Sequence, residues 1–343
     1  MNNMKNKFEI RKGQIDADVQ SELDQIFKYF NEFKIDIDEV EDTYFIELQR
    51  EDYCYCEDLS CGMRDLGVKE VNNTFCYNTL IGVCFSENWL PYINSLIINE
   101  KNTAIIHFDD HSDLMSPYIA KKNDSYFDMI SGKVIDFNNS LDLLECTMSG
   151  AITIGSMLTA MIYSFNTKVD VFHIKRNSID YCGNYKKTTF SDSFLGDSFQ
   201  RLNIEISNEK GVSGDGMYIR CSKTKHIDSY LNAEKTYILH IDMDYFNNRF
   251  NGSNDWKQEW DSDNLSISGQ KELFSDISDF IIRNKLQKKI KKIFIGLSPS
   301  FYPAEFWKMG LLSLVDELCQ TGIDLFDVRE KIKAGVLFDE KRI

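Results

Sequence analysis

The chain has 343 residues, a length that fits one large α/β domain or two smaller ones. Hydrophobic residues make up 43% and aromatic residues 13% of it, which is enough for a substantial core and excludes a disordered chain. The formal net charge of -15 argues against a nucleic-acid partner, because such affinity rests on Lys and Arg that neutralise phosphates. A cationic substrate or partner fits this charge better.

Residues 1–70 are rich in acids, and we expect them to form an N-terminal α+β extension of unknown role. Apolar spacing from Val19 to Phe33 predicts an amphipathic helix, and residues 44–48 predict a short strand. We expect residues 71–343 to form the second part, which carries the chemistry.

From Thr79 onward, short apolar runs alternate with helical segments, a pattern typical of βαβ units around a mainly parallel sheet. The sequence predicts strands at 80–85, 103–108, 169–174, 217–221, 236–241 and 292–297. It predicts helices at 90–99, 154–165, 269–284 and 305–321. Polar stretches at 121–139, 176–216 and 247–268 are expected to be long loops, which are often functional.

Two polar clusters follow apolar runs that are predicted to be buried parallel strands. Asp109, His111 and Asp113 come directly after one such strand and, at i, i+2 and i+4 of an extended segment, start on one face. Asp242 and Asp244 follow another strand with the same spacing. Because open α/β sheets bind ligands beyond the carboxyl ends of their strands, we expect the two clusters to form one metal site.

One imidazole and four carboxylates can hold two divalent cations with a bridging carboxylate. Mixed oxygen and imidazole ligands without thiolate favour Mn²⁺ over Fe²⁺, Co²⁺ or Zn²⁺. A water between two such ions loses a proton near neutral pH, because metal coordination lowers its pKa from roughly 15.7 to about 7. The expected product is a positioned hydroxide nucleophile.

Four further histidines surround or follow these clusters. His107 and His240 each precede the first Asp of their cluster by two residues, so they either hydrogen-bond a ligand carboxylate or are satisfied in the core. His240 is therefore a candidate for the catalytic machinery, as is His173, which could shuttle protons from the end of its predicted strand. His226 lies in a basic segment and is expected at the surface.

The motifs at residues 107–114 (HFDDHSDL) and 240–246 (HIDMDYF) resemble those of the arginase and deacetylase superfamily, whose members hold two Mn²⁺ ions or one Zn²⁺. The residues of these motifs look closer to those of a divergent branch that includes the peptide arginases, which convert arginine to ornithine within ribosomally made peptides. Residues 90–93, 154–156 and 296–303 support the resemblance, which covers roughly residues 79–325. It implies a three-layer αβα fold with a mainly parallel central sheet.

The resemblance also implies a role for each ligand. Asp109 would bridge both ions, His111 would bind one ion and Asp113 the other. Asp242 would be the second bridge, and Asp244 would complete the ion bound by His111. In the arginases this arrangement lets a hydroxide attack the guanidinium carbon, and urea leaves.

The sequence departs from the family at two places. The dinuclear relatives take another His from a segment after the early strand, but no His precedes His107 here. Glu87 could replace it as an oxygen ligand, or Ser86 could leave that coordination to water; Glu87 is otherwise an ordinary acid of a first helical turn. The strand end at residues 298–299 also offers no glutamate to bind the guanidinium, a role that Glu305 could take.

We therefore expect a Mn²⁺-dependent hydrolase of C–N bonds, an enzyme that acts on linear amidines. Its substrate would be an arginine-containing peptide or a small guanidino compound. Two other interpretations stay open: a zinc amidohydrolase of the deacetylase type that uses Asp109, His111 and Asp242, and a binding protein that has the fold without catalysis. Arginase-like proteins are often homo-oligomers, but no feature of this sequence fixes the state.

Location follows from what the sequence lacks. No apolar stretch approaches the ~20 residues that cross a bilayer, and residues 1–6 do not begin a signal peptide. The nine cysteines are an odd number, and Cys54 and Cys56 lack CxxC spacing, which favours reduced thiols over disulfides or zinc. We expect a cytoplasmic protein without a membrane partner.

Overall fold

A computed structural model describes the chain at residues 6–13, 21–30, 33–50, 75–78, 80–96, 102–192, 200–208, 214–249, 264–299 and 301–334. Its described strands form one twelve-stranded sheet and one three-stranded sheet. The larger sheet has the order β4-β5-β15-β14-β6-β10-β13-β11-β12-β7-β8-β9. The site is built on its central strands.

All six strands that the apolar runs predict are present, and they lie side by side and parallel in the middle of the large sheet. Five of them are completely buried or nearly so, as expected for strands covered on both faces. Their bounds are β5 (Ile81–Cys84), β15 (Ile290–Gly296), β14 (Thr236–Asp242), β6 (Thr103–Phe108), β10 (Asp170–Ile174) and β13 (Gly216–Cys221).

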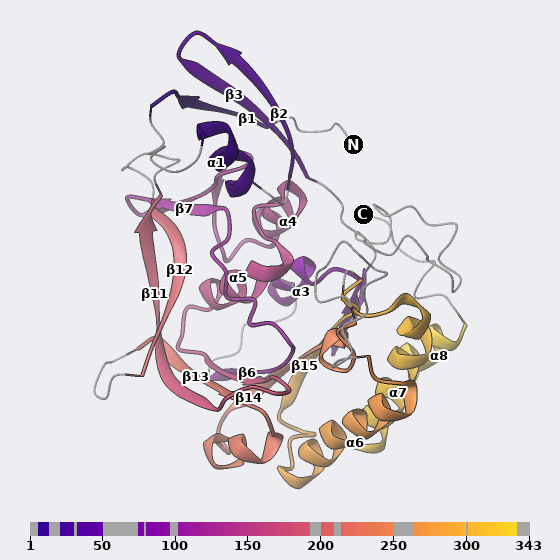
Figure 1. Ribbon diagram of the computed structural model, residues 1–343. Helices are drawn as coiled ribbons and strands as arrows, with labels where there is room; N and C mark the ends of the chain where they lie inside the picture. Colours follow the sequence, from indigo (N-terminus) through magenta and orange to yellow (C-terminus); the bar gives the residue numbers. More distant parts are fainter. Residues whose placement is uncertain are drawn as a thin grey trace.

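Antiparallel strands extend this sheet on both sides, so it is mixed rather than parallel throughout. The strands are β4 (Phe75–Tyr77), β7 (Ile119–Lys122), β8 (Ser125–Asp128), β9 (Val134–Ile135), β11 (Tyr181–Ser191) and β12 (Gln200–Ser207). The prediction of long loops at 121–139 and 176–216 is therefore wrong. Their polar residues belong to half-exposed antiparallel strands, of which β11 and β12 bend away from the parallel strands (Figure 1).

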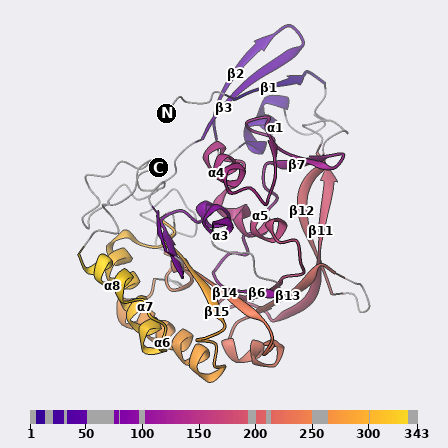
Figure 2. The same ribbon diagram turned by 180° about the vertical axis from the view of Figure 1, so that it is seen from behind.

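Helices pack on both faces of the parallel strands (Figures 1 and 2). One face is covered by α3 (Leu90–Ser95), α4 (Ser140–Ser149) and α5 (Met157–Ser164), which share a core cluster with Ile105, Val171 and Ile238. The other face is covered by α6 (Ile267–Arg283), α7 (Trp307–Gln320) and α8 (Phe326–Lys333). The arrangement is a mixed α/β architecture compatible with the expected three layers.

The first 50 residues contribute an α+β unit to the same molecule. It contains α1 (Glu22–Tyr29) and the antiparallel strands β1 (Asn6–Arg11), β2 (Phe33–Val40) and β3 (Thr43–Arg50). The helix is shorter than the predicted 19–33, of which residues 19–20 and 31–32 lie outside the described part. Ile26 of α1 and Phe30, which follows it, belong to the core cluster that contains α3, α4 and α5, so this unit shares its core with the large sheet.

The chain reverses its direction across the sheet between β6 and β14. These neighbours are parallel, but β6 leads through α4 and α5 to β10 on one side, whereas β14 leads through α6 to β15 on the other. The two connections run on opposite faces, as right-handed crossovers in opposite directions require. Such a reversal leaves a crevice at the carboxyl ends of the two strands, which is the usual ligand site of open α/β sheets.

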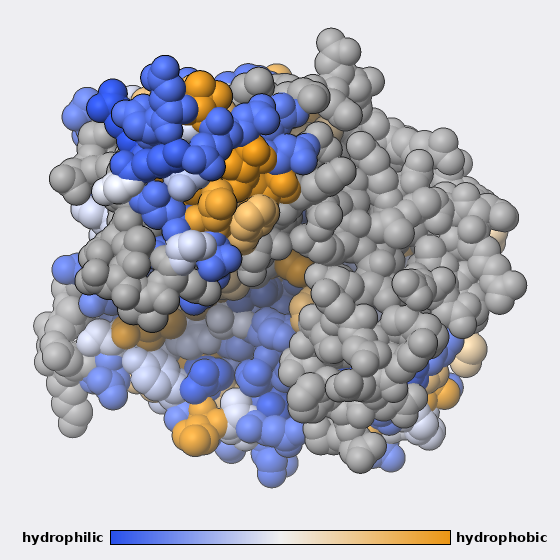
Figure 3. All heavy atoms as spheres, turned by 45° about the horizontal axis from the view of Figure 1, so that its top comes forward, coloured by the Kyte–Doolittle hydropathy of each residue, from blue (hydrophilic) through white to orange (hydrophobic). Residues whose placement is uncertain are grey.

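The surface offers one further observation. On the face drawn in Figure 3, hydrophilic residues cover most of the described area, and hydrophobic residues gather in one part of its upper half. Among the residues that the structure describes, no helix combines the length and the apolar character needed to traverse a bilayer.

Candidate metal centre

The two sequence clusters meet at the reversal point. Asp109 directly follows β6, and Asp242 is the last residue of β14, one residue beyond the paired residues Phe108 and Ile241. Asp244 comes from a short 3₁₀ turn after β14. His111 and Asp244, 133 positions apart in the chain, thus share one site, as predicted.

The candidate ligand atoms form three overlapping groups, each with its atoms within 4.8 Å of one another. Two consist of predicted ligands: Asp109, His111 and Asp244 in one, and Glu87, Asp109 and Asp242 in the other. The third consists of His107, Asp109 and His240, so Asp109 is the member that all three share. Asp113 lies beside Asp109 and Glu87, and the six predicted ligands are thus brought together.

Backbone N–H groups orient the carboxylates. The N–H of His111 donates to Oδ1 of Asp109, and the N–H of Asp244 donates to Oδ1 of Asp242 over 3.1 Å. The Asp110 N–H donates to Oδ1 of Asp244 over 3.2 Å. Each bond uses one oxygen of a carboxylate and leaves the second for another partner, as is common for metal ligands.

The backbone at Asp113 adopts a left-handed conformation, with φ of 50°. This region is costly for most residues but is visited by Asp. The carbonyl of Asp113 accepts hydrogen bonds from the N–H groups of Leu158 and Thr159 at the start of α5, over 3.2 and 3.3 Å. The helix thus holds the loop in the shape that turns the Asp113 side chain into the centre.

Glu87 enters the centre from the 3₁₀ turn Glu87–Trp89 after β5 and is 3% exposed. Its Oε1 lies 2.7 Å from Nε2 of His240. Gly296, at the end of β15, makes room for it, because a Cβ there would overlap the Glu87 side chain and lie 2.8 Å from its Cδ. Glu87 therefore lies inside the acidic cluster, where its carboxylate can serve as an oxygen ligand.

Burial dominates the electrostatics of the cluster. It raises the pKa of the carboxyls of Glu87, Asp109 and Asp242 well above their usual range, and the neighbouring carboxylates raise it further. Burial also raises the pKa of Asp113 to about 7. For His111, burial lowers the pKa, but the hydrogen bond to Asp244 and the surrounding carboxylates outweigh this effect and raise it to about 9. The cluster holds more negative charge than its own residues neutralise.

The centre fits a divalent cation. Within the described part of the chain, Oδ2 of Asp109 and Oδ2 of Asp113 are buried and have no hydrogen-bond partner. Buried polar atoms are normally satisfied, and buried like charges normally have a counterion. Carboxylates with one imidazole are the ligands of Mn²⁺, Fe²⁺ and Zn²⁺ rather than of soft, thiolate-bound metals. These buried His and Asp groups can bind a metal ion, and the donor set alone leaves its identity open.

Three histidines form a row across the strands below the cluster. His240, His107 and His173 are directly paired on β14, β6 and β10, and each is at most 1% exposed. Both ring nitrogens of His173 are engaged: Nδ1 lies 2.7 Å from the Tyr218 hydroxyl and Nε2 lies 3.0 Å from the Asp109 carbonyl oxygen. His173 thus supports the backbone of Asp109, and its ring offers no unoccupied nitrogen for proton transfer.

Glu305 is the predicted site residue that the structure does not bring into the centre. Its carboxylate pairs with Arg249 at the surface, where the Glu305 side chain is 41% exposed. An exposed carboxylate beside a guanidinium gains an ion pair there, so it serves the start of α7 rather than the cluster. His226 pairs with Asp180 at the surface, as expected.

Two residues at the rim were not found by the sequence analysis. Lys175 donates to the carbonyl of Asp110, and Asn248 donates to Oδ2 of Asp110 over 2.7 Å. Asp110 is therefore held outside the two metal subsites, and it fixes the loop that carries His111. Lys175 directly follows β10, and this position at the end of a predicted strand is the one sequence feature that could have pointed to it.

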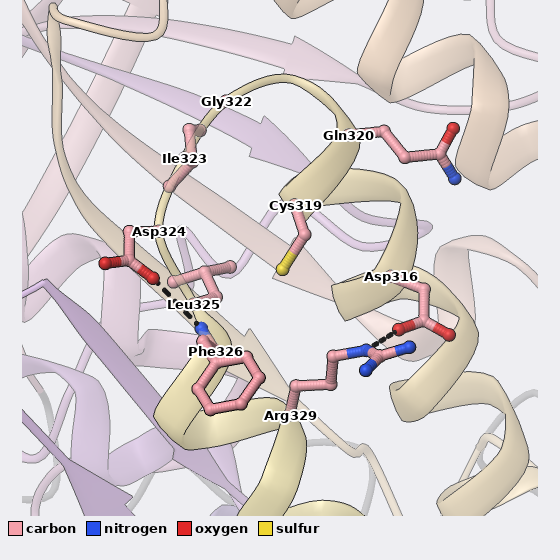
Figure 4. Close-up of a pocket in the computed structure, with 9 residues that line it drawn as sticks. All are labelled: Asp316, Cys319, Gln320, Gly322, Ile323, Asp324, Leu325, Phe326 and Arg329. Carbon is pink, nitrogen blue, oxygen red and sulfur yellow. Dashed lines mark hydrogen bonds and ion pairs between the residues drawn. The ribbon is translucent and has the colours of Figure 1, made fainter.

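A separate surface hollow lies where α7 turns into α8. It is lined by Asp316, Cys319, Leu325 and Arg329 among others, and Cys319 points into it (Figure 4). The Asp316–Arg329 ion pair closes one side. None of its lining residues belongs to the acidic cluster, so the hollow is not part of the metal centre.

Neither a comparison with protein-family models nor one with curated proteins finds a match for this chain. The function is therefore inferred from the residues of the centre and from their geometry.

Proposed function

We propose that the protein is an arginase-like metal-dependent hydrolase of C–N bonds, most simply a peptide arginase that converts arginine side chains to ornithine and urea. The observation that carries this proposal is the pair of ligand groups that share Asp109. A shared carboxylate between two subsites is typical of hydrolases with two metal ions.

The residues divide naturally between two ions. Glu87, Asp109, Asp113 and Asp242 would hold one, and Asp109, His111 and Asp244 would hold the other, with Mn²⁺ favoured in both. When bound, such ions supply a water that is acidic enough to act as a nucleophile near neutral pH.

The chain supplies the rest of the site. His111 is the most accessible member of the cluster, with 36% of its side chain exposed, so substrate reaches the centre past this residue. The ring of Phe301 lies 4.7 Å from that of His111 and forms one wall beside it. A guanidinium is cationic and planar, and it suits both the surplus negative charge of the cluster and an aromatic wall.

The reaction balances without a further reactant. Water adds its oxygen to the guanidinium carbon, and its two protons pass to the side-chain nitrogen. The bond from the carbon to that nitrogen breaks, and the nitrogen leaves as the ammonium group of ornithine. The remaining carbon and its two nitrogens leave as urea. The protein's task is to hold the guanidinium carbon beside the metal subsites and to prevent the substrate from binding in unproductive orientations.

The test is to incubate the Mn²⁺-loaded protein with arginine-containing peptides and free arginine, and to measure urea and ornithine. We expect urea from at least one peptide, and none from the Asp109→Asn variant, which removes the shared carboxylate. A correctly folded, Mn²⁺-loaded protein that releases no urea from any arginine substrate contradicts the proposal.

One observation favours a second candidate. Asp109 and His111 are grouped with Asp244, rather than with the Asp242 expected from the sequence, and this set has the three ligands that catalytic zinc sites use. A zinc amidohydrolase of the deacetylase type would bind one ion tightly and hydrolyse acylated amines. Measured metal content distinguishes the two, and an absence of both metal and activity would favour a binding protein.

A further inference from the structure

Glu87, His240 and His107 form a continuous line of hydrogen bonds inside the protein. Oε1 of Glu87 lies 2.7 Å from Nε2 of His240, and Nδ1 of His240 lies 2.6 Å from Nδ1 of His107. The two rings are nearly parallel, with 13° between their planes and 4.8 Å between their centroids. All three side chains are buried, so bulk water cannot interrupt the line.

The charge state of Glu87 determines which ring nitrogen of His240 and of His107 carries a proton. A Glu87 that binds a cation is ionised and can only accept a hydrogen bond, so Nε2 of His240 must donate. A neutral His240 then has Nδ1 as its acceptor, and Nδ1 of His107 must donate to it. A neutral His107 consequently has a bare nitrogen at Nε2.

That bare nitrogen faces other acceptors. Nε2 of His107 lies 3.5 Å from Oδ2 of Asp109 and 3.9 Å from Oδ2 of Asp113. Without a metal ion, Nε2 can donate to the carbonyl oxygen of His111, 3.3 Å away, so metal binding at Glu87 has to move the proton of His107 from Nε2 to Nδ1. Both carboxylate oxygens are buried and lack hydrogen-bond partners within the described residues. Acceptors that converge in this way repel one another unless a cation lies between them.

The distances suit a shared ion. Two atoms that each bind one ion at about 2.1 Å lie roughly 3 to 4 Å apart, depending on the angle between the bonds. The separations of Nε2 from Asp109 and Asp113 fall in this range.

We propose that Nε2 of His107 is a ligand of the ion held by Glu87, Asp109 and Asp113, in place of the histidine that the sequence lacks upstream. The proposal deepens the proposed function, because it assumes that the centre binds metal, and it adds a second imidazole to the ligand set. His240 then acts as a positioning residue that holds the ring of His107 and the carboxylate of Glu87.

His173 provides a matched control. It sits beside His107 in the same row and is equally buried, but its nitrogens bind the Tyr218 hydroxyl and the Asp109 carbonyl. Because a carbonyl accepts, Nε2 of His173 carries the proton. The two histidines should therefore carry their protons on opposite nitrogens.

Histidine-ring ¹⁵N NMR tests this directly, with Zn²⁺ as a diamagnetic probe. The chain has only five histidines, so single substitutions can assign every ring signal. In the Zn²⁺-loaded protein we expect His107 to be protonated at Nδ1 and to show a metal-bound shift at Nε2 that a chelator removes. We expect His173 to be protonated at Nε2 and insensitive to the chelator.

Affinity gives a second readout. His107→Gln should weaken binding of one Zn²⁺ by at least about tenfold, while His226→Gln, which changes a surface histidine outside the cluster, should change it little. A protonated Nε2 on His107 in the loaded protein, unchanged affinity in His107→Gln, or no bound Zn²⁺ would overturn the proposal. If His107 shows the metal-bound shift but no substrate yields urea, this inference stands and the proposed function fails.

Discussion

The carboxylate of Glu87 occupies the space that a side chain at Gly296 would need. Gly296 is the last residue of β15 and pairs with Cys84 of β5. Because glycine has no Cβ, the Glu87 side chain can cross the end of the strand and reach the acidic cluster. The predicted replacement ligand therefore depends on a glycine more than 200 residues away in the chain.

Gly296→Ala tests this dependence. Its methyl group would overlap the Glu87 side chain and displace it, so we expect metal affinity to fall by about 10- to 100-fold. The measurement is a metal titration by calorimetry. Gly82→Ala is the control, because its Cβ would meet only Ile93 and Phe294, and unchanged affinity in Gly296→Ala would show that Glu87 is not a ligand.

The shared position of Asp109 predicts unequal losses of metal. Asp109→Asn removes a member of both ligand groups, whereas Asp244→Asn removes a member of one. We expect Asp109→Asn to retain no tightly bound ion and Asp244→Asn to retain one, as measured by elemental analysis after gel filtration. Equal retention in the two variants would contradict two subsites joined at Asp109.

Metal removal should make stability depend on pH in a defined direction. The pKa of Asp113 is about 7 in the folded protein, above that of an unfolded aspartate, so the folded state alone holds this proton near neutrality. Stability of the metal-free protein is therefore greater at about pH 6 and is lost as the pH rises toward about 8. Thermal unfolding in a chelator measures this.

Asp113→Asn should flatten that dependence, because an amide cannot ionise. At about pH 8 we expect the metal-free variant to melt higher than the metal-free wild type and to bind metal less tightly. If the melting temperature of the wild type in a chelator increases between about pH 6 and about pH 8, the cluster has no surplus of negative charge.

His173 predicts the opposite trend at lower pH. Burial lowers its pKa to about 3, so the folded protein keeps it neutral while the unfolded chain protonates below about 6.5. Stability is thus lost as the pH falls from about 6.5, by up to roughly 1.4 kcal/mol per pH unit for this group. His173→Gln should reduce the slope of the unfolding free energy against pH, with that free energy measured by urea unfolding at each pH.

Arg201 fastens the N-terminal unit to the large sheet. Its guanidinium lies over the ring of Tyr118 at 4.3 Å and over that of Tyr29 at 5.3 Å, and Nη1 donates to the Tyr29 hydroxyl over 3.1 Å. Nε also donates to the Pro117 carbonyl over 2.9 Å. Arg201→Ala should therefore lower the unfolding free energy by about 2 kcal/mol.

The control for this prediction is Lys133→Ala, which removes an exposed ion pair with Glu145 and should cost less than about 1 kcal/mol. Limited proteolysis gives an independent readout, because a loosened α1 should be cut sooner in Arg201→Ala. Equal stability of the two variants would show that Arg201 does not hold the unit in place.

The central strands could be predicted because they are buried on both faces and read as continuous apolar runs, as Thr103–Phe108 does. The long strand Tyr181–Ser191 was missed for the opposite reason. It is half exposed and rich in Lys, Thr and Asn, so its composition resembles that of a loop. Its partners β12 and β13 stabilise it, and pairing of this kind is not visible in a local pattern.

The ligands could be predicted from spacing, because alternate residues at a strand end share a face. The line from Glu87 through His240 to His107 could not, since it depends on the register between β6 and β14 and on the place of β5 two strands away. Glu305 was misplaced because nearness in sequence to the strand end suggested nearness to the site. The side chain of Arg249 binds it instead.

The reversal of the chain between β6 and β14 also sets when the centre can exist. Synthesis from the N-terminus delivers Glu87, Asp109, His111 and Asp113 long before Asp242 and Asp244. β14 pairs with β6, and β15, which is made later still, fills the place between β14 and β5. A nascent chain that ends before β14 lacks Asp242 and Asp244, one member of each acidic group. Tight metal binding would therefore come late, and the bound ion would link early and late parts of the chain.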